Sequence, residues 1–196
     1  MDEYCGKTQL GIYSLAAQLS QLLWMLPLAI ATVLYSYAST VSKEEAVNYT
    51  IRLKQIAFYG TLVLGFAGLL LSYYFIPILY GKQFNNAFDL MKFFVIGVIP
   101  FSVPTVISSL FAARGNFKIS FIIGAGIFVI STIMYFTLIP RFGMRGGAIA
   151  SSIAYLLASI LAEIWFCKEY KVSYLNLFKI ERSLLSVSAI KKMIKN

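Results

Sequence analysis

The feature that most constrains this chain is a long stretch without charge near its N-terminus. No charged residue lies between Lys7 and Lys43, and the segment from Leu10 to Ser42 is mostly apolar. About 20 apolar residues are enough to cross a hydrocarbon core of roughly 30 Å as a helix. The stretch is therefore predicted to span a bilayer, and the rest of the fold must be compatible with a membrane.

This first span is predicted to pack against other helices and to bend. Its polar side chains are expected to face protein, because an unpaired amide in hydrocarbon is costly; they belong to Gln18, Ser20, Gln21, Thr32 and Ser36. Pro27 lies in the middle of the span and removes one backbone hydrogen bond, which neighbouring helices can compensate. We expect a kink at this proline.

The composition places the whole chain among integral membrane proteins. Of its 196 residues, 59% are hydrophobic and 13% are charged, whereas soluble domains carry about 25% charged residues. The net charge of +9 comes from cations in short segments between apolar runs, which indicates topology signals and not a nucleic-acid-binding surface. No nucleic acid partner is expected. The opening residues MDEY lack the cationic stretch of a cleavable signal peptide, so the first span is expected to act as an uncleaved insertion signal.

Windows nearly free of charge divide the chain into five spans, at about 10–38, 55–81, 93–113, 119–140 and 146–167. The connections are short, so sequential helices are expected to pack as antiparallel neighbours. The sequence thus predicts an all-α polytopic bundle of five transmembrane helices within residues 1–167. The segment 168–196 is predicted to be a basic amphipathic cytoplasmic tail, with one apolar helical face formed by Leu177, Ile180, Leu184 and Val187.

The distribution of cations predicts the orientation of this bundle. Twelve Lys and Arg residues fall in the first loop, the third loop and the C-terminal tail, against five in the N-terminus, the second loop and the fourth loop. Cytoplasmic loops of membrane proteins carry the excess of Lys and Arg. The N-terminus is therefore predicted outside and the C-terminus in the cytoplasm of a bacterial inner membrane protein.

Local patterns predict how individual helices begin, bend and pack. Ser42 followed by Glu45 forms a capping box that starts a helix leading into the second span. Pro100 and Pro104 are predicted to kink the third span; the alternative is a broken helix that builds a transporter's substrate site. Small residues at every fourth position of the fifth span predict a face for close helix packing; they are Ala150, Ala154 and Ala158, with Gly147 and Ser151 alongside.

Two charged residues are candidates for function, each with a structural alternative. Glu163 lies near the inner boundary of the fifth span, where its carboxylate can reach water or take part in ion coupling. Arg114, beside a tight turn that contains Gly115 and Asn116, is interpreted as a cytoplasmic anchor, with the binding of a substrate phosphate as the alternative.

The sequence argues against an enzyme and against a cofactor or metal site. It contains no phosphate-binding P-loop, no nucleophile elbow, and no HExxH or CxxC motif. Histidine is absent, and the two cysteines, Cys5 and Cys167, are predicted on opposite faces of the membrane. Hydrolytic catalysis and ATP-driven transport by this chain alone are thus not expected.

Four ordered segments resemble the signatures of polysaccharide-biosynthesis flippases, which belong to the multidrug/oligosaccharidyl-lipid/polysaccharide exporter superfamily. The segments are GIYSLAAQLSQLLWMLPLAIATVL, PILYGKQFNNAF, ARGNF and LIPRFGMRGGAIASSIAY, and the resemblance extends from Gly11 to Trp165. It implies one part of a fold with two six-helix lobes around a central cavity, in which this chain is similar to helices eight to twelve. It also implies the transport of undecaprenyl-pyrophosphate-linked oligosaccharides across the inner membrane, and it agrees with the orientation derived from charge.

The chain departs from this family at two points. Ser36 stands where the family often has a proline, and the first lobe with the opening helix of the second has no counterpart, so a truncated or split reading frame is one interpretation. The cationic cavity residues of the family have no match within the spans. A missing first lobe or self-association, together with membrane lipids and the lipid-linked oligosaccharide, is therefore expected among the partners.

The resemblance requires polar groups that face a cavity between two lobes. Gln18 and Gln21, one turn apart, and Tyr13 further out are the candidates, because uncharged amides and hydroxyls can bind sugar hydroxyls without the cost of burying an ion. Two other functions remain open: a membrane interaction or assembly subunit without transport of its own, and a drug-efflux relative within the same superfamily.

Overall fold

The computed structural model describes residues 2–172 as a bundle of helices. Their order is α1 (Asp2–Gln21), the 3₁₀ turn η1 (Leu22–Trp24), α2 (Met25–Ala38), α3 (Lys43–Leu79), η2 (Lys82–Phe84), α4 (Asn85–Ala113) and α5 (Phe117–Tyr170). No strand occurs in this part of the chain. The amphipathic helix predicted between Leu177 and Val187 lies outside the described residues.

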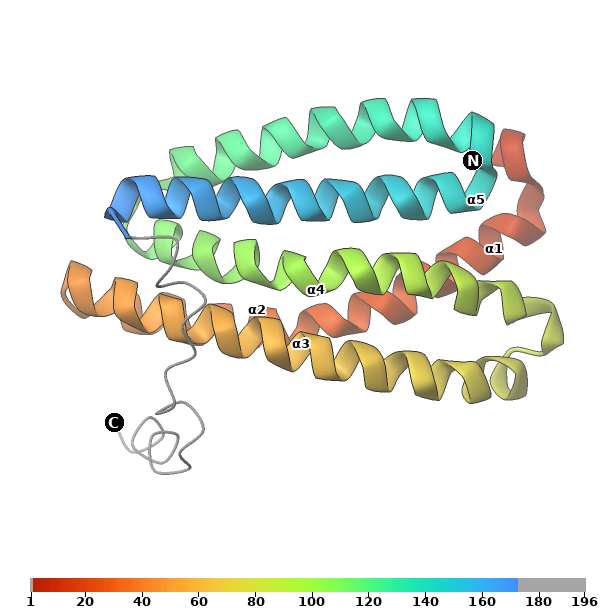
Figure 1. Cartoon of the computed structure of the whole chain (residues 1–196), viewed down its shortest axis with the longest axis horizontal. Coiled ribbons are helices and arrows are strands. Elements are labelled where there is room, and N and C mark those ends of the chain that lie inside the picture. Colours follow the sequence, from red (N-terminus) through yellow and green to blue (C-terminus); the bar gives the residue numbers. More distant parts are fainter. Residues whose placement is uncertain (1, 173–196) are drawn as a thin grey trace.

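The longest helix, α5, is folded back on itself. Gly143 has φ 58° and ψ −135°, which interrupts the helix, and the two parts run side by side in opposite directions (Figure 1). We call residues 117–142 the first arm and residues 144–170 the second arm. Because α1 and α2 form one long apolar segment and α5 is folded into two arms, these segments with α3 and α4 are long enough for five crossings. The predicted all-α polytopic fold is confirmed.

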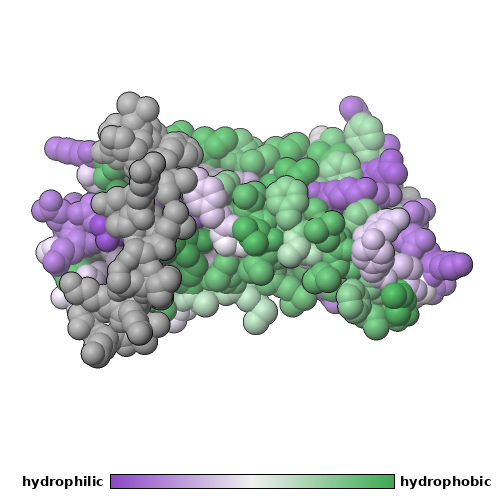
Figure 2. All heavy atoms as spheres, turned by 60° about the horizontal axis from the view of Figure 1, so that its bottom comes forward, coloured by the Kyte–Doolittle hydropathy of each residue, from purple (hydrophilic) through white to green (hydrophobic). Residues whose placement is uncertain are grey.

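The surface of the bundle is that of a membrane protein. A hydrophobic band separates two hydrophilic ends (Figure 2), and large apolar side chains such as Leu70, Ile78 and Phe121 are mostly exposed. Four helices are long and apolar enough to cross a bilayer, and α5 is 54 residues long, sufficient for two crossings. The chain is therefore a multi-pass membrane protein.

The predicted start of α3 is confirmed at atomic detail. The Ser42 hydroxyl accepts a hydrogen bond from the Glu45 backbone N–H at 3.3 Å, and the Glu45 carboxylate accepts one from the Ser42 backbone N–H at 3.3 Å. This reciprocal capping box extends the helix through a segment that charge alone assigned to a loop. In the turn before α5, Gly115 has φ 72° whereas Asn116 has φ −92°, so only the glycine adopts a left-handed conformation.

The prolines bend the chain in different ways. The 3₁₀ turn η1 ends three positions before Pro27 and includes Leu23, the residue whose carbonyl a proline at position 27 leaves without its helical partner. The helix is therefore irregular about one turn before Pro27, and a kink at the proline itself stays a prediction. Pro100 and Pro104 lie inside α4, which continues as one helix from Asn85 to Ala113, so this helix is not broken into two.

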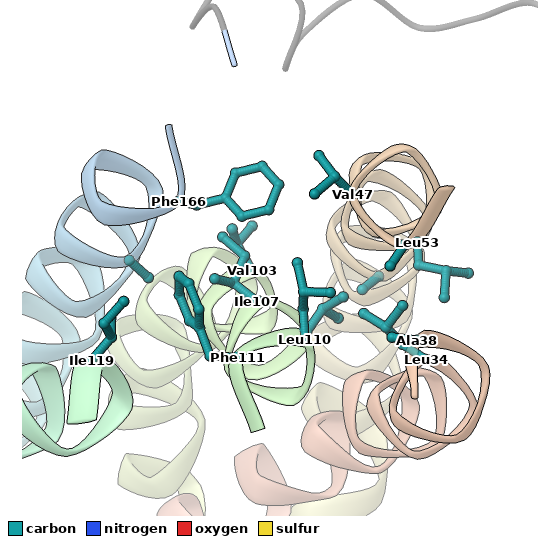
Figure 3. Packing of buried hydrophobic residues seen from close by; sticks show 14 of the residues in the cluster. Leu34, Ala38, Val47, Leu53, Val103, Ile107, Leu110, Phe111, Ile119 and Phe166 are labelled. Atoms are coloured by element: carbon teal, nitrogen blue, oxygen red, sulfur yellow. The ribbon is translucent and has the colours of Figure 1, made fainter. Parts of the chain in front are cut away.

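Packing is organised around α4. At the end of the bundle where α2 turns into α3, apolar side chains from α2, α3 and both arms of α5 surround Ile107, Leu110 and Phe111 of α4 (Figure 3). A second cluster near the opposite end joins α1 to α4, with Ile12 and Ala16 against Leu90 and Phe94 among its members. The central helix thus fixes the other four crossings relative to one another.

The second arm approaches α4 closely through small residues. Ala150, Ala154 and Ala158 are buried, as predicted for the small-residue face. A Cβ atom added at Gly97 of α4 would lie 2.6 Å from the Cα atom of Ser152, and the Ser152 hydroxyl donates a hydrogen bond to the Phe93 carbonyl across the interface. Close approach and an interhelical hydrogen bond together stabilise this contact in a membrane.

Candidate functional site

A salt bridge joins α3 to the second arm of α5, close to the end of the bundle where α2 turns into α3. The Nζ atom of Lys54 on α3 donates hydrogen bonds to both carboxylate oxygens of Glu163 on the second arm, at 2.6 and 2.8 Å. The Lys54 side chain is 3% exposed and the Glu163 side chain 23% exposed. Ionisable groups in membrane spans are costly unless they are paired, and they commonly mark functional sites.

The helices determine the position of this ion pair. Lys54 follows the start of α3 by eleven residues, about 16 Å at a rise of 1.5 Å per residue. Glu163 precedes the end of α5 at Tyr170 by two turns. The Lys54 Nζ atom also lies 5.1 Å from the centre of the Phe166 ring, which adds a cation–π contact to the ion pair.

A groove of about 410 Å³ opens beside the ion pair. Its walls come from α3, α4 and the second arm, and its lining residues include Lys54, Gln55, Tyr59, Pro100, Ser159 and Glu163. Residues on its rim, among them Ile160 and Ile164, are exposed on the apolar surface of the bundle. The site therefore combines a lipid-facing opening with two opposite charges and three neutral polar side chains.

Hydroxyl groups from α1 and both arms of α5 form a second polar cluster. The Tyr135 hydroxyl of the first arm and the Ser151 hydroxyl of the second arm are 2.7 Å apart, and Tyr13 of α1 lies close to Ser151. Tyr155 lies close to both tyrosines. Because Ser151, Tyr155, Ser159 and Glu163 follow one another at every fourth position, this cluster and the ion pair lie on one polar stripe of the second arm.

The three residues predicted to face a transport cavity differ in their exposure. Gln18 and Gln21 are exposed on α1. Tyr13 is half-buried, and its ring contacts that of Phe94 edge to face, with the ring centres 5.4 Å apart. The glutamines therefore do not join the Ser151 cluster, and their role stays a prediction.

Arg114 contacts the backbone of a neighbouring turn. Its Nη2 atom donates hydrogen bonds to the carbonyl oxygens of Val41 at 2.9 Å and Ser42 at 2.7 Å. These bonds hold the connection between α2 and α3 against the end of α4, which favours the anchoring role among the two predicted for this arginine. Binding of a phosphate remains untested.

Sequence reasoning did not identify Lys54 as part of a site. The lysine was counted with the cations of the first loop, since it directly precedes the charge-free window of the second span. Its partner is 109 residues away. The available signal was Glu163 itself, because a carboxylate in a span requires a cation at the same depth.

The described residues contain no group of three or more His, Cys, Asp or Glu side chains that could hold a metal ion. Cys167 is a buried free thiol beside the ion pair.

Comparison with known proteins identifies one family. The model of the family described as lipid II flippase MurJ matches residues 8–193 of the chain. No curated protein and no solved structure matches the chain. The match agrees with the lipid-linked flippases that the sequence motifs indicated and does not extend to their polysaccharide-specific members.

Proposed function

Because the chain belongs to the lipid II flippase MurJ family, we propose that it moves a lipid-linked precursor across the inner membrane as one lobe of an alternating-access transporter. The observation that carries the proposal is the family match over residues 8–193, which includes all five crossings and the polar groups described above. The family is one of transporters and not of catalytic enzymes. Transport then depends on the movement of helices and not on bond chemistry.

The exposed polar side chains of α1 favour the presence of a second helix bundle beside it. Gln18 and Gln21 are exposed on a helix that is apolar around them, and amides that face hydrocarbon without a hydrogen-bond partner are strongly unfavourable. A second bundle that packs against this face would cover them and create the polar path that a sugar headgroup needs. Alternating access then requires the two bundles to rock around a site near the middle of the membrane.

The substrate that we propose is a glycan linked to an undecaprenyl carrier through phosphate. The family description favours the peptidoglycan precursor lipid II, whereas the motifs from Gly11 to Trp165 resemble exporters of longer oligosaccharides. Both substrates share an isoprenoid tail, a phosphate group and a sugar headgroup, so both use the same classes of contact.

Complementation tests this function and distinguishes the two substrates. One bacterial strain is depleted of its lipid II flippase, and a second lacks the flippase for a surface polysaccharide. Each receives the 196-residue chain alone or together with a separately expressed first lobe. We expect rescue with the first lobe in one of the two strains, and a reduced rescue by the variant Gln18→Leu/Gln21→Leu.

Other outcomes of the complementation test would favour a different function. Rescue by the chain alone contradicts the two-lobe proposal and indicates a homo-oligomer that builds its own cavity. A chain that inserts, binds the first lobe and rescues neither strain favours the assembly-subunit function. Accumulation of the chain in the membrane is measured in every strain, so that a failure to insert is recognised.

A further inference from the structure

The depth of Lys54 in the membrane can be read along α3. Lys54 precedes the end of this helix at Leu79 by 25 positions, which corresponds to about 38 Å at 1.5 Å per residue. The hydrocarbon core is roughly 30 Å thick. With Leu79 at one interface, the Lys54 ammonium therefore lies just beyond the opposite edge of the hydrocarbon, at the depth of the lipid phosphate groups.

The groove beside this ammonium suits a lipid. Apolar side chains on its rim belong to Leu156, Ile160 and Ile164, all of them exposed on the surface of the bundle. A tail that enters between them leads its headgroup to Glu163, the more exposed member of the ion pair. The Lys54 ammonium lies immediately behind this carboxylate, at 2.6 Å.

The charge of the ion pair limits which lipid headgroups can bind in the groove. The ion pair is neutral as a whole, and an anionic phosphate added beside it would leave one negative charge without a partner next to the Lys54 side chain, which is only 3% exposed. Neutrality is restored when the Glu163 carboxylate takes up one proton. The ammonium then loses its first partner and becomes available to the phosphate.

We propose that Lys54 binds the phosphate of a membrane lipid in this groove in exchange for Glu163, and that Glu163 takes up one proton in the exchange. Before binding, Lys54 is positive and Glu163 negative. Afterwards Lys54 is paired with the negative phosphate, Glu163 is a neutral acid, and the proton has come from the aqueous phase. The groove becomes a site at which lipid binding and proton uptake are obligatorily linked; this role rests on the proposed function.

The charged and titratable groups around Glu163 are compatible with this exchange. From α3 the groove receives Lys54 and Tyr59, and from the second arm the Cys167 thiol lies within electrostatic reach. The residues that α4 contributes, Pro100 and Val103, do not titrate. Glu163 is therefore the group whose proton uptake is expected to follow lipid binding.

The test measures lipid binding as a function of pH. The chain is reconstituted in phosphatidylcholine vesicles, and binding of a fluorescent polyprenyl monophosphate is followed by anisotropy between about pH 5 and pH 8. The dephosphorylated polyprenol serves as the probe for binding through the tail alone. We expect the affinity of the parent chain for the phosphate to rise, relative to Glu163→Gln, by up to about tenfold per unit of pH lowered. Titration of the lipid itself is common to both chains and cancels in this comparison.

Variants distinguish phosphate binding by Lys54 from proton uptake by Glu163. Glu163→Gln is expected to bind at least about tenfold more tightly than the parent at the upper end of this range. The double variant Lys54→Met/Glu163→Leu removes both charges, leaves no unpaired ion, and is expected to lose phosphate-dependent binding while polyprenol binding is kept. Asp89→Asn/Lys92→Gln neutralises the exposed pair on α4, whose side chains are each 49% exposed, and is expected to bind as the parent does.

Two results would overturn the proposal: phosphate binding by the double variant equal to that of the parent, or identical pH dependence of the parent and Glu163→Gln. Because the assay measures binding by this chain and not transport, either result can occur together with rescue in the complementation test. The exchange site would then be wrong while the flippase function stands.

Discussion

The two arms of α5 have opposite surfaces although a single residue, Gly143, joins them. The first arm presents large apolar side chains to the outside, with Phe121 and Phe136 exposed by 76% and 78%. The second arm buries small ones, including Ala154 and Ala158. In a bilayer, bulky apolar residues are as well solvated by lipid as by protein, so small residues mark the protein interface because they allow backbones to approach. Small size, and not greater hydrophobicity, therefore marks the packed face of the second arm along residues 150–158.

Glycines show the same contrast. A Cβ atom added at Gly124 or Gly126 of the first arm would meet no heavy atom within 4 Å. At Gly146 of the second arm it would overlap the carbonyl oxygen of Leu138. The same residue type is thus replaceable in one arm and required in the other.

The largest effect is expected for Gly146→Ala. Because the new methyl group would overlap backbone atoms of Leu138, the two arms must separate near their turn, at a cost of at least about 3 kcal/mol. Thermal unfolding in detergent, followed by tryptophan fluorescence, is expected to show a large fall in the midpoint or no folded protein. A variant as stable as the parent would contradict the described hairpin.

A smaller loss is expected for Ala154→Leu. The side chain is 3% exposed at the contact between the second arm and the rest of the bundle, and overpacking a close helix contact costs about 1–3 kcal/mol. Ala125→Leu in the exposed part of the first arm is the matched control, with the same change in volume and no expected loss. Equal unfolding midpoints for the two variants would show that both faces contact lipid.

Ser151→Ala is expected to have a moderate effect. It removes the hydroxyl that lies 2.7 Å from the Tyr135 hydroxyl, and the loss of one interhelical hydrogen bond in a membrane protein costs about 0.6 kcal/mol on average. Tyr135→Phe removes the same bond from the other side, so the double variant should be no less stable than the less stable single variant. Fully additive losses would show that the two hydroxyls do not interact.

An effect of similar size and opposite sign is expected for Gly126→Ala. The position is helical and open, and an alanine restricts the unfolded chain, which stabilises a helix by up to about 1 kcal/mol. The unfolding midpoint should be equal to or slightly above that of the parent. A clear fall would place this face of the first arm against protein.

The sequence predicted the parts of the fold that depend on local pattern. Charge-free windows located the crossings, the small-residue repeat located the packing face, and Ser42 with Glu45 located the start of α3. The helix that carries the second span begins at Lys43, as the capping box predicted, whereas the charge-free window begins only at residue 55. Charged residues indicate which part of the chain contacts water, whereas the capping box indicates where a helix begins. In residues 43–54 the two signals differ, because the segment is both charged and helical.

The site could not be assembled from sequence in the same way. Glu163 was singled out by its charge, but Lys54 was assigned to a loop, and only the packing of α3 against the second arm brings the two together. Gln18 and Gln21 were selected by polarity alone, which does not distinguish a face covered by another helix of this chain from an exposed one. Pairing across 109 residues is a property of the tertiary fold.

The turn at Gly143 also has a consequence for biogenesis. With helix on both sides of one interrupting residue, the arms of α5 are too closely joined to enter the membrane one after the other as independent segments. They must insert together as a helical hairpin whose tip carries Arg141 and Arg145. In the orientation predicted from the charges, this tip lies outside, so an arginine that crosses the hydrocarbon centre costs about 3 kcal/mol on the insertion scale, and the apolar side chains of two arms entering at once would offset this cost. The hairpin, and not the single helix, is thus the unit of membrane insertion in this part of the chain.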